Sequence, residues 1–594
     1  MSLIVQKYGG TSVADCEKIT AAARKAIRAQ KEGHQVLMVV SAMGKNTDML
    51  VGLAKEITER PSAREMDMLL STGEQVSVSL MAMAIHALGY KAVSLTGAQI
   101  GIKTDSTHTK ARIHSIETSR VQRLLDEGNI VIAAGFQGID ENFEITTLGR
   151  GGSDTTAVAL AAVLNADACE INTDVDGVYT TDPRVLPDAR KLSRISYDEM
   201  LELASLGAGV MHSRSIEFAK KFGVPIHVRS SFTDVPGTMI VDQVESKSRP
   251  VSGAAITKNE ARVTVEGVPD IPGISHQLFA SIASRAIAVD MVVQNVGNDG
   301  KANVSFTVPE EELQQTLEAV KEVHEGIHDS NISHDNQVSK VSVVGLGMAD
   351  QPGVADKMFR VLSEADINIQ MITTSEIKIS VLVAREDAQR ALQIVHNGFQ
   401  LDVAPDDAPQ SAEAVKRERE LDAAEVVAQL RFMEDLTIDD ISLDNSQALV
   451  TIRQIPDTPG IAAKVFEAIA ETGILVDMIV QNVGRDGSAN ISFTIPRESV
   501  ADAQKVTETI GKDLGAEEVT TKADAAKLSV SGIGLRSHTS VGIRMFEALS
   551  KAGINVDLIN TSEVMVNVIV DNSKADDALA CLKEAFADVL MDSK

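Results

Sequence analysis

Two glycine-rich segments contain the residues that could do chemistry. Lys7–Ser12 reads KYGGTS and follows a short apolar run, and Gly149–Asp154 reads GRGGSD and follows the run Phe143–Thr147. Each segment is predicted to join a strand to a helix, which points backbone N–H groups and a helix N-terminus at one place. Lys7 and Arg150 add positive charge there. The pattern predicts a phosphoryl-transfer site, although either loop alone could be an ordinary turn.

Neither common nucleotide-binding fingerprint fits these segments. Gly44–Thr47 resembles the end of a Walker A loop, but Val39 stands where its first glycine should be. The dinucleotide fingerprint lacks its βαβ context here. The predicted phosphate site must therefore be of another kind.

Alternating β-forming and amphipathic stretches must position the two loops. Over residues 1–240 a helix is expected to end near Gly33 and another to lie beyond Thr47. This alternation predicts an open, mostly parallel α/β sheet. Ligands bind beyond the carboxyl ends of such strands, where both loops and the segments 41–44 and 135–138 are expected. The expected strands are Leu3–Val5, Val36–Val40, Ala92–Leu95, Ile130–Ala133, Ile145–Leu148, Ala168–Ile171 and Val224–Val228.

Composition limits the class of protein. The 594 residues exceed what one core holds and predict roughly four domains. A hydrophobic content of 44% and a charged content of 24% are typical of a soluble globular protein, and a cytoplasmic location is expected. With no Trp and 3% aromatic residues, the cores must consist of Ala, Val, Ile, Leu and the 20 Met. The formal net charge of −28 argues against nucleic acid or an anionic membrane as partner.

The cysteines and the apolar runs suggest no further chemistry. Cys16, Cys169 and Cys581 lie far apart without C-x-x-C spacing, so neither a zinc site nor a disulfide is expected and a reducing compartment fits. Residues 1–30 show no signal-peptide pattern. No stretch of about 18 apolar residues is expected to span a membrane.

The C-terminal half contains a tandem duplication with an offset of 187 residues. Asp290–Pro309 and Asp477–Pro496 are identical at 15 of 20 positions. Further matches at the same offset show that one repeat unit contains two modules, so four modules follow one another. Each module is predicted to run strand, turn, helix, strand, strand, helix, which is the ferredoxin-like βαββαβ pattern. Residues 403–435, rich in Asp, Glu, Ala, Lys and Arg, are expected to form a surface helix between the units.

With these motifs together, the chain resembles the aspartate kinases of the amino acid kinase family. Lys7–Ser12, Gly149–Asp154 and the segment Thr173–Arg184 match the family's signatures, and the C-terminal modules resemble ACT domains. The chain departs from the commoner family pattern because it has four ACT-like modules where that pattern has two. The resemblance implies a catalytic domain at 1–245, modules 1 to 4 at 246–336, 337–400, 441–523 and 524–594, and a connector at 401–440.

The resemblance implies transfer of the γ-phosphoryl group of ATP to the side-chain carboxylate of L-aspartate. The product would be 4-phospho-L-aspartate, at the entry to lysine, threonine and methionine synthesis. An aspartate carboxylate is ionised at neutral pH, so the reaction needs no general base and depends on positioning and charge neutralisation. Lys7 would contact the transferring phosphates and Asp154 would orient Lys7. Mg²⁺ would bridge the phosphates rather than bind protein side chains.

The same resemblance implies the residues around the two substrates. Arg150 would grip a substrate carboxylate and Glu74 would meet the substrate ammonium. The other substrate-binding residues would be Ser41, Thr47, Gly151, Gly152 and Ser153. ATP would contact Lys7, Tyr8, Gly9, Gly10, Thr173, Asp174, Tyr179, Asp182, Arg184, Gly209 and Val210.

Several of these residues have a plain structural alternative. Glu74 could be an acid in the first turn of a helix, and Asp154 could be a helix N-cap. The 173–184 segment could be a turn that Asp and Pro stabilise. Lys7 has the weakest alternative, because a buried lysine at a sheet end without an anion would be costly.

The ACT-like modules imply regulation by amino acids, with lysine and threonine expected to inhibit together. The segments at Asp270 and Asp457 precede helices whose N-terminal N–H groups could take an effector carboxylate, although Pro-Gly could simply start each helix. Gln294 is expected to share a site with Asn368-Ile369, and Gln481 with Asn555-Val556. A homodimer is expected through module edges, because open ferredoxin-like edges pair readily. The remaining expected effector-binding residues are Gly273, Ile274, Ser375, Glu376, Gly460, Ile461, Ser562 and Glu563.

Two rival functions remain open. Acetylglutamate, glutamate or carbamate kinases would share the phosphate loops, but the ACT-like tail and the segment Thr72–Glu74 favour aspartate. A non-catalytic amino-acid sensor on a kinase scaffold would be expected to lack the phosphate-loop residues. Lys7, Arg150 and Asp154 are all present.

Overall fold

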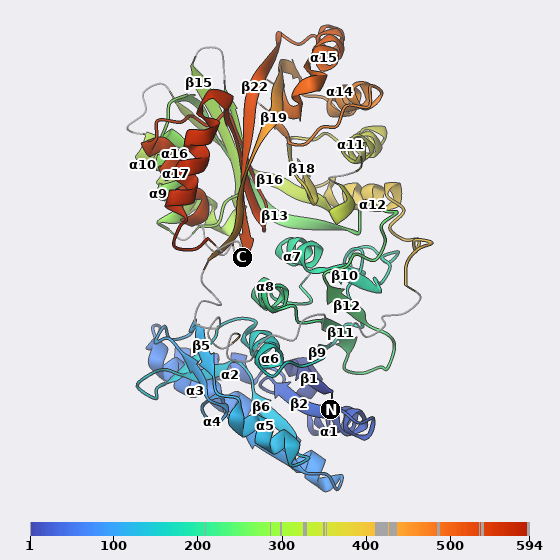
Figure 1. Cartoon of the computed structure of the whole chain (residues 1–594), viewed down its shortest axis with the longest axis vertical. Helices are drawn as coiled ribbons and strands as arrows, with labels where there is room; N and C mark the ends of the chain where they lie inside the picture. Colours follow the sequence, from blue (N-terminus) through green and yellow to red (C-terminus); the bar gives the residue numbers. More distant parts are fainter. Residues whose placement is uncertain are drawn as a thin grey trace.

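The chain folds into an N-terminal α/β domain followed by a larger region of strands with helices outside them (Figure 1). The computed structural model describes residues 2–207, 209–285, 287–296, 300–324, 330–348, 351, 353–409, 426, 436–483, 487–533, 535 and 540–590. Most of the surface helix expected at 403–435 lies outside the described residues. Of that segment, residues 403–409 form turns and irregular structure rather than a helix, and Val426 is buried in the core of the N-terminal domain.

An eight-stranded sheet forms the centre of the N-terminal domain. Its strand order is β10-β12-β11-β9-β1-β2-β6-β3, and every neighbouring pair is parallel except β11 and β12. The expectation of an open, mostly parallel sheet is confirmed. The strands are β1(Leu3–Tyr8), β2(Gln35–Val40), β3(Ala92–Leu95), β6(Ile130–Ala134), β9(Ala168–Thr173), β10(Arg194–Ser196), β11(Ile226–Ser230) and β12(Thr238–Val241).

Helices cover both faces of this sheet, so its central strands are apolar on both sides. In β2, Leu37 and Val39 face the core under α5, α6 and α8, whereas Met38 and Val40 face the core under α1 and α3. The period-two alternation of a strand produces this division. The helices of the domain are α1(Cys16–Lys31), α2(Asn46–Ile57), α3(Ala63–Ala87), α4(Gly97–Ile100), α5(Ser119–Asp126), α6(Gly152–Val163), α7(Tyr197–Ser205) and α8(Ser213–Phe222).

One expected strand of the parallel sheet lies elsewhere. The run expected at Ile145–Leu148 forms β8(Ile145–Thr147), which pairs antiparallel with β7(Gln137–Ile139). Together with β4(Ile102–Thr104) and β5(Ile113–Ile116) they make a separate four-stranded sheet in the order β5-β4-β7-β8. A three-residue apolar run does not specify its partner, because pairing is a tertiary property. The GRGGSD segment therefore leaves the edge of this small sheet to enter α6.

Helix α3 bears on the expectation that no segment spans a membrane. Among the described residues it is the one helix long and apolar enough to span a bilayer, with a mean hydropathy of 1.3 over its best window. Half of that window is buried inside the domain. Residues such as Val78, Met81 and Ile85 pack in the core shared with α1 and the sheet. A core helix accounts for this composition.

The C-terminal region is built on one twelve-stranded sheet in the order β14-β15-β13-β16-β18-β17-β20-β21-β19-β22-β24-β23. Figure 1 shows helices α9, α10, α16 and α17 on one side of the strands and α11, α12, α14 and α15 on the other. The strands are β13(Gly253–Pro269), β14(Asp290–Val296), β15(Lys301–Pro309), β16(Asn331–Val344), β17(Met371–Ser375), β18(Lys378–Ala384), β19(Thr437–Pro456), β20(Ile479–Val483), β21(Ser488–Pro496), β22(Glu518–Ile533), β23(Leu558–Thr561) and β24(Met565–Asp571). The helices are α9(Ile274–Ala283), α10(Leu313–His324), α11(Val354–Glu364), α12(Ala388–Gly398), α14(Ile461–Ala470), α15(Val500–Leu514), α16(Ser540–Lys551) and α17(Ala575–Ala585).

Four long strands each serve two modules. In β13 the segment 253–257 pairs with 340–344 of β16 beside β18, whereas 260–266 pairs with 331–338 beside β15. The strands β19 and β22 repeat this arrangement in the second unit. The last strand of modules 2 and 4 is therefore supplied by a segment that precedes the module in the sequence. Four ferredoxin-like modules are present, and the boundaries expected at 336 and 523 fall inside β16 and β22.

Module edges pair within the chain. In the middle of the sheet β17 of module 2 pairs antiparallel with β20 of module 3, and at its two ends β14 of module 1 contacts β23 of module 4. Apolar side chains of these four strands share one cluster that includes Met291, Met371, Met478 and Leu558. The edges expected to join two copies of the chain thus meet inside one copy.

Candidate functional site

A buried ion pair lies where the two glycine-rich segments meet. The ammonium of Lys7, in β1, is 2.5 Å from a carboxylate oxygen of Asp154, in the first turn of α6. Both residues are 9% exposed. The N-cap of α6 is Gly151, so the alternative of Asp154 as the cap is wrong. The structure brings the two residues expected to be catalytic into direct contact.

A large cavity opens around this pair at the carboxyl ends of the strands. Its volume is about 990 Å³. It is lined by expected site residues from both loops and from the segments after β2 and in α2 and α3, namely Lys7, Gly9, Gly10, Ser41, Thr47, Glu74, Arg150, Gly151, Gly152, Ser153 and Asp154. Expected site residues up to 147 positions apart in the sequence therefore share one site.

Glu74 presents a carboxylate to the cavity from the middle of α3. One oxygen accepts a hydrogen bond from the Ala42 N–H at 3.1 Å. The other is buried and has no hydrogen-bond partner among the described residues. Burial raises the pKa of Glu74 to about 7. Since Glu65 occupies the first turn of α3, Glu74 is not a first-turn acid, and its position suits an ammonium ligand.

Close packing holds the two loops in place. Gly10 lies against the carbonyl groups of Ala42 and Gly44, so a Cβ there would be 2.9 Å from the nearer oxygen. Gly151 has φ +72°, and a Cβ there would be 2.5 Å from the Cβ of His212. Both positions need glycine for steric reasons. The backbone that lines the cavity is therefore closely constrained.

Two cavity residues, His212 and Arg214, were missed by the sequence reading. The Arg214 guanidinium donates to the carbonyl of Leu148 at 2.6 Å and to that of Ala111 at 3.2 Å. It thereby ties the start of the GRGGSD segment to α8. His212 packs against Gly151 as the N-cap of α8, and burial and the neighbouring Arg214 lower its pKa. No motif signals either residue, because both follow the loop by some 60 positions.

Only some of the residues expected to bind ATP line the cavity. Lys7, Gly9 and Gly10 line the cavity. Tyr8 is fully buried in the core under α1 and α3, so its side chain does not face the cavity. Successive residues of a strand face opposite sides, which separates Tyr8 from Lys7.

The segment 173–184 lies outside the cavity lining but begins beside the phosphate loop. The Gly9 N–H is 3.4 Å from the carbonyl of Asn172, the residue before Thr173. Within the segment the Tyr179 hydroxyl donates to Asp176, and Arg184 pairs with Asp182 at 2.8 Å. Asp174 is exposed, and Gly209 and Val210 also lie outside the cavity lining. Side chains outside the segment hold it as well, since Asp176 pairs with Lys191 at 3.0 Å.

The expected effector residues form two sites, but with partners exchanged. Gln481 donates to the carbonyl of Ile369 at 2.8 Å, and Asn368 donates to Asp457 at 3.1 Å. In the other site Gln294 donates to the carbonyl of Val556 and Asn555 donates to Asp270. The expected combinations of Gln294 with Asn368-Ile369 and of Gln481 with Asn555-Val556 are therefore wrong. Pairing of β17 with β20 places module 2 beside module 3, which leaves module 1 beside module 4.

The site between modules 2 and 3 is closed in this structure. Gly460 and Ile461 at the start of α14 line it with Asp457, Asn368 and Gln481, and its volume is about 10 Å³. That is room for about one water molecule. A larger ligand would have to displace the hydrogen bonds that join the two modules. Gly273 and Ile274 occupy the equivalent positions at the start of α9.

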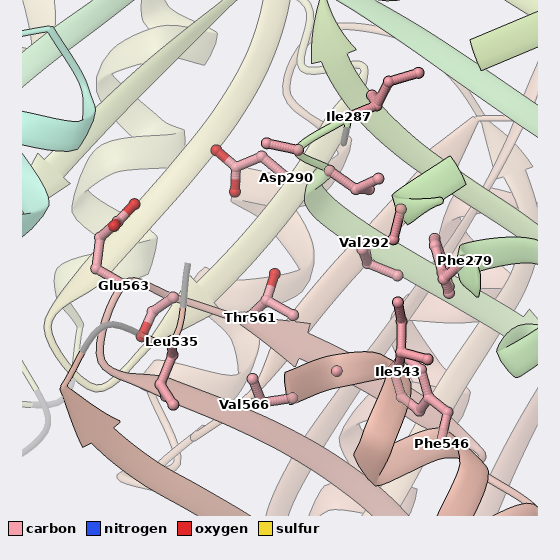
Figure 2. Close-up of a pocket in the computed structure, with 15 residues that line it drawn as sticks. Phe279, Ile287, Asp290, Val292, Leu535, Ile543, Phe546, Thr561, Glu563 and Val566 are labelled. Carbon is pink, nitrogen blue, oxygen red and sulfur yellow. The ribbon is translucent and has the colours of Figure 1, made fainter. Parts of the chain in front are cut away.

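The four remaining expected effector residues line two other cavities. Ser375 and Glu376 line a cavity of about 260 Å³ between modules 2 and 3. Ser562 and Glu563 line a cavity of about 100 Å³ between modules 1 and 4. Figure 2 shows Glu563 and Asp290 toward one side of the smaller cavity and apolar Phe279, Val292, Ile543 and Phe546 toward the other. The structure does not bring these residues together with the Asp457 and Asp270 sites.

Among the described residues, no group of three or more His, Cys, Asp or Glu side chains is arranged to hold a metal ion. The cavity around Lys7 instead combines cationic side chains, one ion pair and one buried carboxylate. This arrangement can bind an anion at the glycine loops and an ammonium at Glu74 at the same time.

Comparisons with known proteins assign a family to both regions of the chain. Residues 2–230 match the model of the amino acid kinase family, and residues 263–324, 341–399, 452–509 and 528–586 match that of the ACT domain. An aspartokinase of Geobacillus stearothermophilus is 51% identical, over 68% of this chain and 98% of the relative. The crystal structure of an aspartate kinase from Synechocystis is 38% identical with a TM-score of 0.52, and it covers 99% of this chain and 98% of that one.

Escherichia coli aspartokinase III is similar in two solved states. In complex with aspartate and ADP it is 26% identical with a TM-score of 0.55, over 67% of this chain and 99% of that one. In complex with lysine and aspartate it is 25% identical with a TM-score of 0.54, over the same shares of both chains.

Proposed function

Because this chain belongs to the aspartokinases of the amino acid kinase family, we propose that it transfers the γ-phosphoryl group of ATP to the side-chain carboxylate of L-aspartate. The product is 4-phospho-L-aspartate. The observation that carries this proposal is one cavity holding the Lys7–Asp154 pair and the partly unsatisfied carboxylate of Glu74. A zwitterionic amino acid and a polyphosphate need these opposite charges within one site.

The roles of the residues follow from their charge and placement. Lys7 neutralises charge on the transferring phosphoryl group, and Asp154 holds the Lys7 ammonium in position. Gly9 and Gly10 let the backbone approach the phosphates. Mg²⁺ bound with ATP would supply further neutralisation of the phosphate charge.

For aspartate, Glu74 takes the ammonium group and Arg150 the carboxylate that does not react. Ser41, Thr47 and the segment Gly151–Ser153 complete the pocket. Because the acceptor carboxylate is already ionised, the enzyme needs no general base. Its contribution is to hold two anions in line and to neutralise charge.

On the nucleotide side, the segment from Thr173 and Asp174 to Tyr179, Asp182 and Arg184 binds the adenosine part of ATP, with Gly209 and Val210 nearby. Its start beside Gly9 supports this role. The Tyr8 side chain takes no part, because it is buried in the core.

Regulation is by amino acids. Lysine and threonine inhibit together and bind between modules at the Asp270 and Asp457 sites and in the cavities lined by Glu376 and Glu563. The presence of lysine in a solved state of the E. coli relative supports this proposal. The enzyme acts at the first step of lysine, threonine and methionine synthesis in the cytoplasm. A homodimer through the ACT modules would have to use surfaces other than the four edges already paired.

The test is ATP-dependent acyl-phosphate formation, trapped with hydroxylamine, on aspartate and on glutamate. We expect turnover on aspartate but not on glutamate, and we expect lysine plus threonine to suppress it. If the rate on aspartate is the same with and without lysine and threonine, the kinase activity is supported and the proposed regulation is refuted. A folded protein that binds amino acids without any turnover would refute the proposed reaction.

A further inference from the structure

One carboxylate of the kinase domain touches both halves of the regulatory region. Glu202, in α7, is 0% exposed. One of its oxygens accepts a hydrogen bond from the backbone N–H of Glu563 at 3.0 Å. The other is 2.9 Å from the ammonium of Lys378, which is itself buried. Glu563 belongs to module 4 and Lys378 to module 2.

Both partners of Glu202 come from hairpins that form walls of the inter-module cavities. Lys378 begins β18, directly after the turn whose Ser375 and Glu376 line the cavity between modules 2 and 3. Glu563 lies in the turn between β23 and β24 and itself lines the cavity between modules 1 and 4 (Figure 2). The adjacent Val564 packs on the core of the kinase domain. Each cavity is therefore connected to the Glu202 side chain by the hairpin that lines it.

The two hairpins are repeats of each other but meet Glu202 with different groups. At the offset of 187 residues, Glu376 corresponds to Glu563, and Lys378 corresponds to Met565. Module 2 thus contributes an ammonium group and module 4 a backbone amide. The two repeated hairpins therefore contact the same carboxylate through different groups.

Charge makes this contact sensitive to movement. Although burial disfavours its charged form, the pKa of Lys378 is raised because Glu202, Asp290 and Glu563 surround it. Burial raises the pKa of Glu202, and Lys378 opposes that rise. Separating a buried pair leaves an uncompensated charge, which is strongly unfavourable. A shift of either hairpin must therefore be followed by α7 or cost the ion pair.

Helix α7 leads on to the substrate loop. One turn before Glu202, Glu199 accepts hydrogen bonds from the Ser252 hydroxyl at 2.6 Å and the Leu346 N–H at 3.1 Å. Helix α7 packs on α8. At the start of α8, His212 contacts Gly151 and Arg214 holds the carbonyl of Leu148. A continuous set of contacts joins Glu202 to the loop that carries Arg150.

We propose that Glu202 is the junction through which both inter-module cavities control the substrate loop. The inference rests on the proposed function, since it assumes that amino acids occupying these cavities inhibit the kinase. An effector in either cavity displaces its hairpin, and the displacement reaches α7 through the Glu563 amide or the Lys378 ammonium. Two effectors act together because both act on one carboxylate.

The test uses two substitutions in the full-length enzyme and their combination. Glu202→Gln keeps an acceptor for the Glu563 amide and removes the charge. Lys378→Met introduces the residue found at the equivalent repeat position. The double variant removes both charges of the buried pair, so no unpaired charge remains. It therefore tests the proposal even if a single variant fails to fold. Arg28→Met is the control for loss of a paired cation in the kinase domain, because Arg28 lies on α1 and pairs with Asp234 at 2.8 Å, away from the contact between α7 and α8.

For each variant, initial rates on aspartate are measured with and without lysine and threonine, and calorimetry measures the binding of each amino acid. In the Glu202→Gln and double variants we expect kcat and the aspartate KM within about twofold of wild type and binding retained. The effector concentration for half-inhibition should rise about tenfold or more. Lys378→Met should weaken inhibition through one cavity more than through the other, and Arg28→Met should leave inhibition unchanged.

Undiminished inhibition in the folded double variant would overturn the inference. So would loss of effector binding along with inhibition, because the side chains would then only build the binding sites. The wild-type enzyme in the same assay separates failure of this inference from failure of the proposed function. If the wild-type enzyme shows no turnover, the proposed reaction is refuted. If the wild-type rate is the same with and without lysine and threonine, the proposed regulation is refuted, and this inference is refuted with it.

Discussion

The ammonium of Lys7 lies 2.5 Å from a carboxylate oxygen of Asp154, and both residues are largely buried and line the cavity of about 990 Å³ in the kinase domain. The pair joins the carboxyl end of β1 to the first turn of α6, so it fixes the two glycine-rich segments relative to each other. A phosphate that binds Lys7 enters a site where the cation is already positioned. Such preorganisation is what electrostatic catalysis of phosphoryl transfer needs.

Removing the Lys7 ammonium should therefore abolish measurable turnover. Lys7→Ala is expected to lower kcat by at least about 10²–10³-fold, the usual cost of one charge-stabilising donor. Asp154→Asn should lower kcat less, because the ammonium remains but loses its partner. Hydroxylamine-trapped product measures both effects. Lys18→Ala, an exposed lysine on α1, is the control, and a fully active Lys7→Ala enzyme would sink the mechanism.

Glu74 should give the aspartate reaction a dependence on pH. Its raised pKa of about 7 means that it is protonated below that pH in the empty site and ionised above it. Only the ionised form attracts an ammonium, so kcat/KM for aspartate should fall about tenfold per pH unit below pH 7 and level off above it. Binding of aspartate at pH 6 should release a proton, because the ammonium lowers the pKa of the carboxyl group.

Glu74→Gln checks this assignment. The variant should lose about 10- to 100-fold in kcat/KM for aspartate, with the ATP KM unchanged, since one hydrogen bond to a charged group is lost. The pH dependence near 7 should disappear with it. If the profile of the variant kept the same inflection, a different group would be responsible for it.

Gly151 should be required for activity more than for stability. Gly151→Ala places a side chain at φ +72° and drives it into His212. Gly128→Ala is a matched control, because Gly128 has φ +79° and nothing within 4 Å of the added Cβ. Both variants should lose about 1–2 kcal/mol of stability from the left-handed backbone, and the clash with His212 adds to the loss in Gly151→Ala. Only Gly151→Ala should also lower kcat/KM, by about 10²-fold, because it shifts the substrate loop. Equal activity of the two variants would contradict this role for the loop.

Much of the kinase domain was predictable because its signals are local. Strand and helix alternation yields the parallel sheet and places Lys7 near the carboxyl end of β1. The loop with Arg150 was also expected at that edge, but it follows β8 of the small sheet. Alternation along β1 also separates Tyr8 from Lys7, a signal that the family resemblance obscured. Strand β8 was misplaced, since a three-residue run carries no information about its partner. His212 and Arg214 were missed because their contacts depend on how α8 packs against α6.

The regulatory half shows a different limit. The repeat predicts four similar modules, but repeated modules offer nearly the same edges to one another. Sequence order suggests that modules 1 and 2 share a site, whereas pairing of β17 with β20 joins modules 2 and 3. Long strands such as β13, which serve two modules at once, are not visible as a pattern. These choices are made by tertiary packing, such as the cluster around Met291 and Met371.

The exchanged partners lead to a prediction that sequence order would not make. Asn368 and Gln481 hydrogen-bond across one site, and Asn555 and Gln294 across the other. Asn368→Ala should therefore shift the response to the same effector as Gln481→Ala, and Asn555→Ala should behave like Gln294→Ala. The four variants are compared by the concentration of lysine or threonine that gives half-inhibition, which should rise about 5- to 100-fold.

Uninhibited activity should stay at the wild-type level in all four, because none of these residues is near the kinase cavity. Gln314→Ala is the control, since Gln314 is exposed on α10 and bonds only to Glu318 among the described contacts. Measuring both effectors on each variant separates the alternatives. If Asn368→Ala grouped with Gln294→Ala instead, the two modules of one repeat unit would share a site, and the pairing of β17 with β20 would not describe the regulated enzyme.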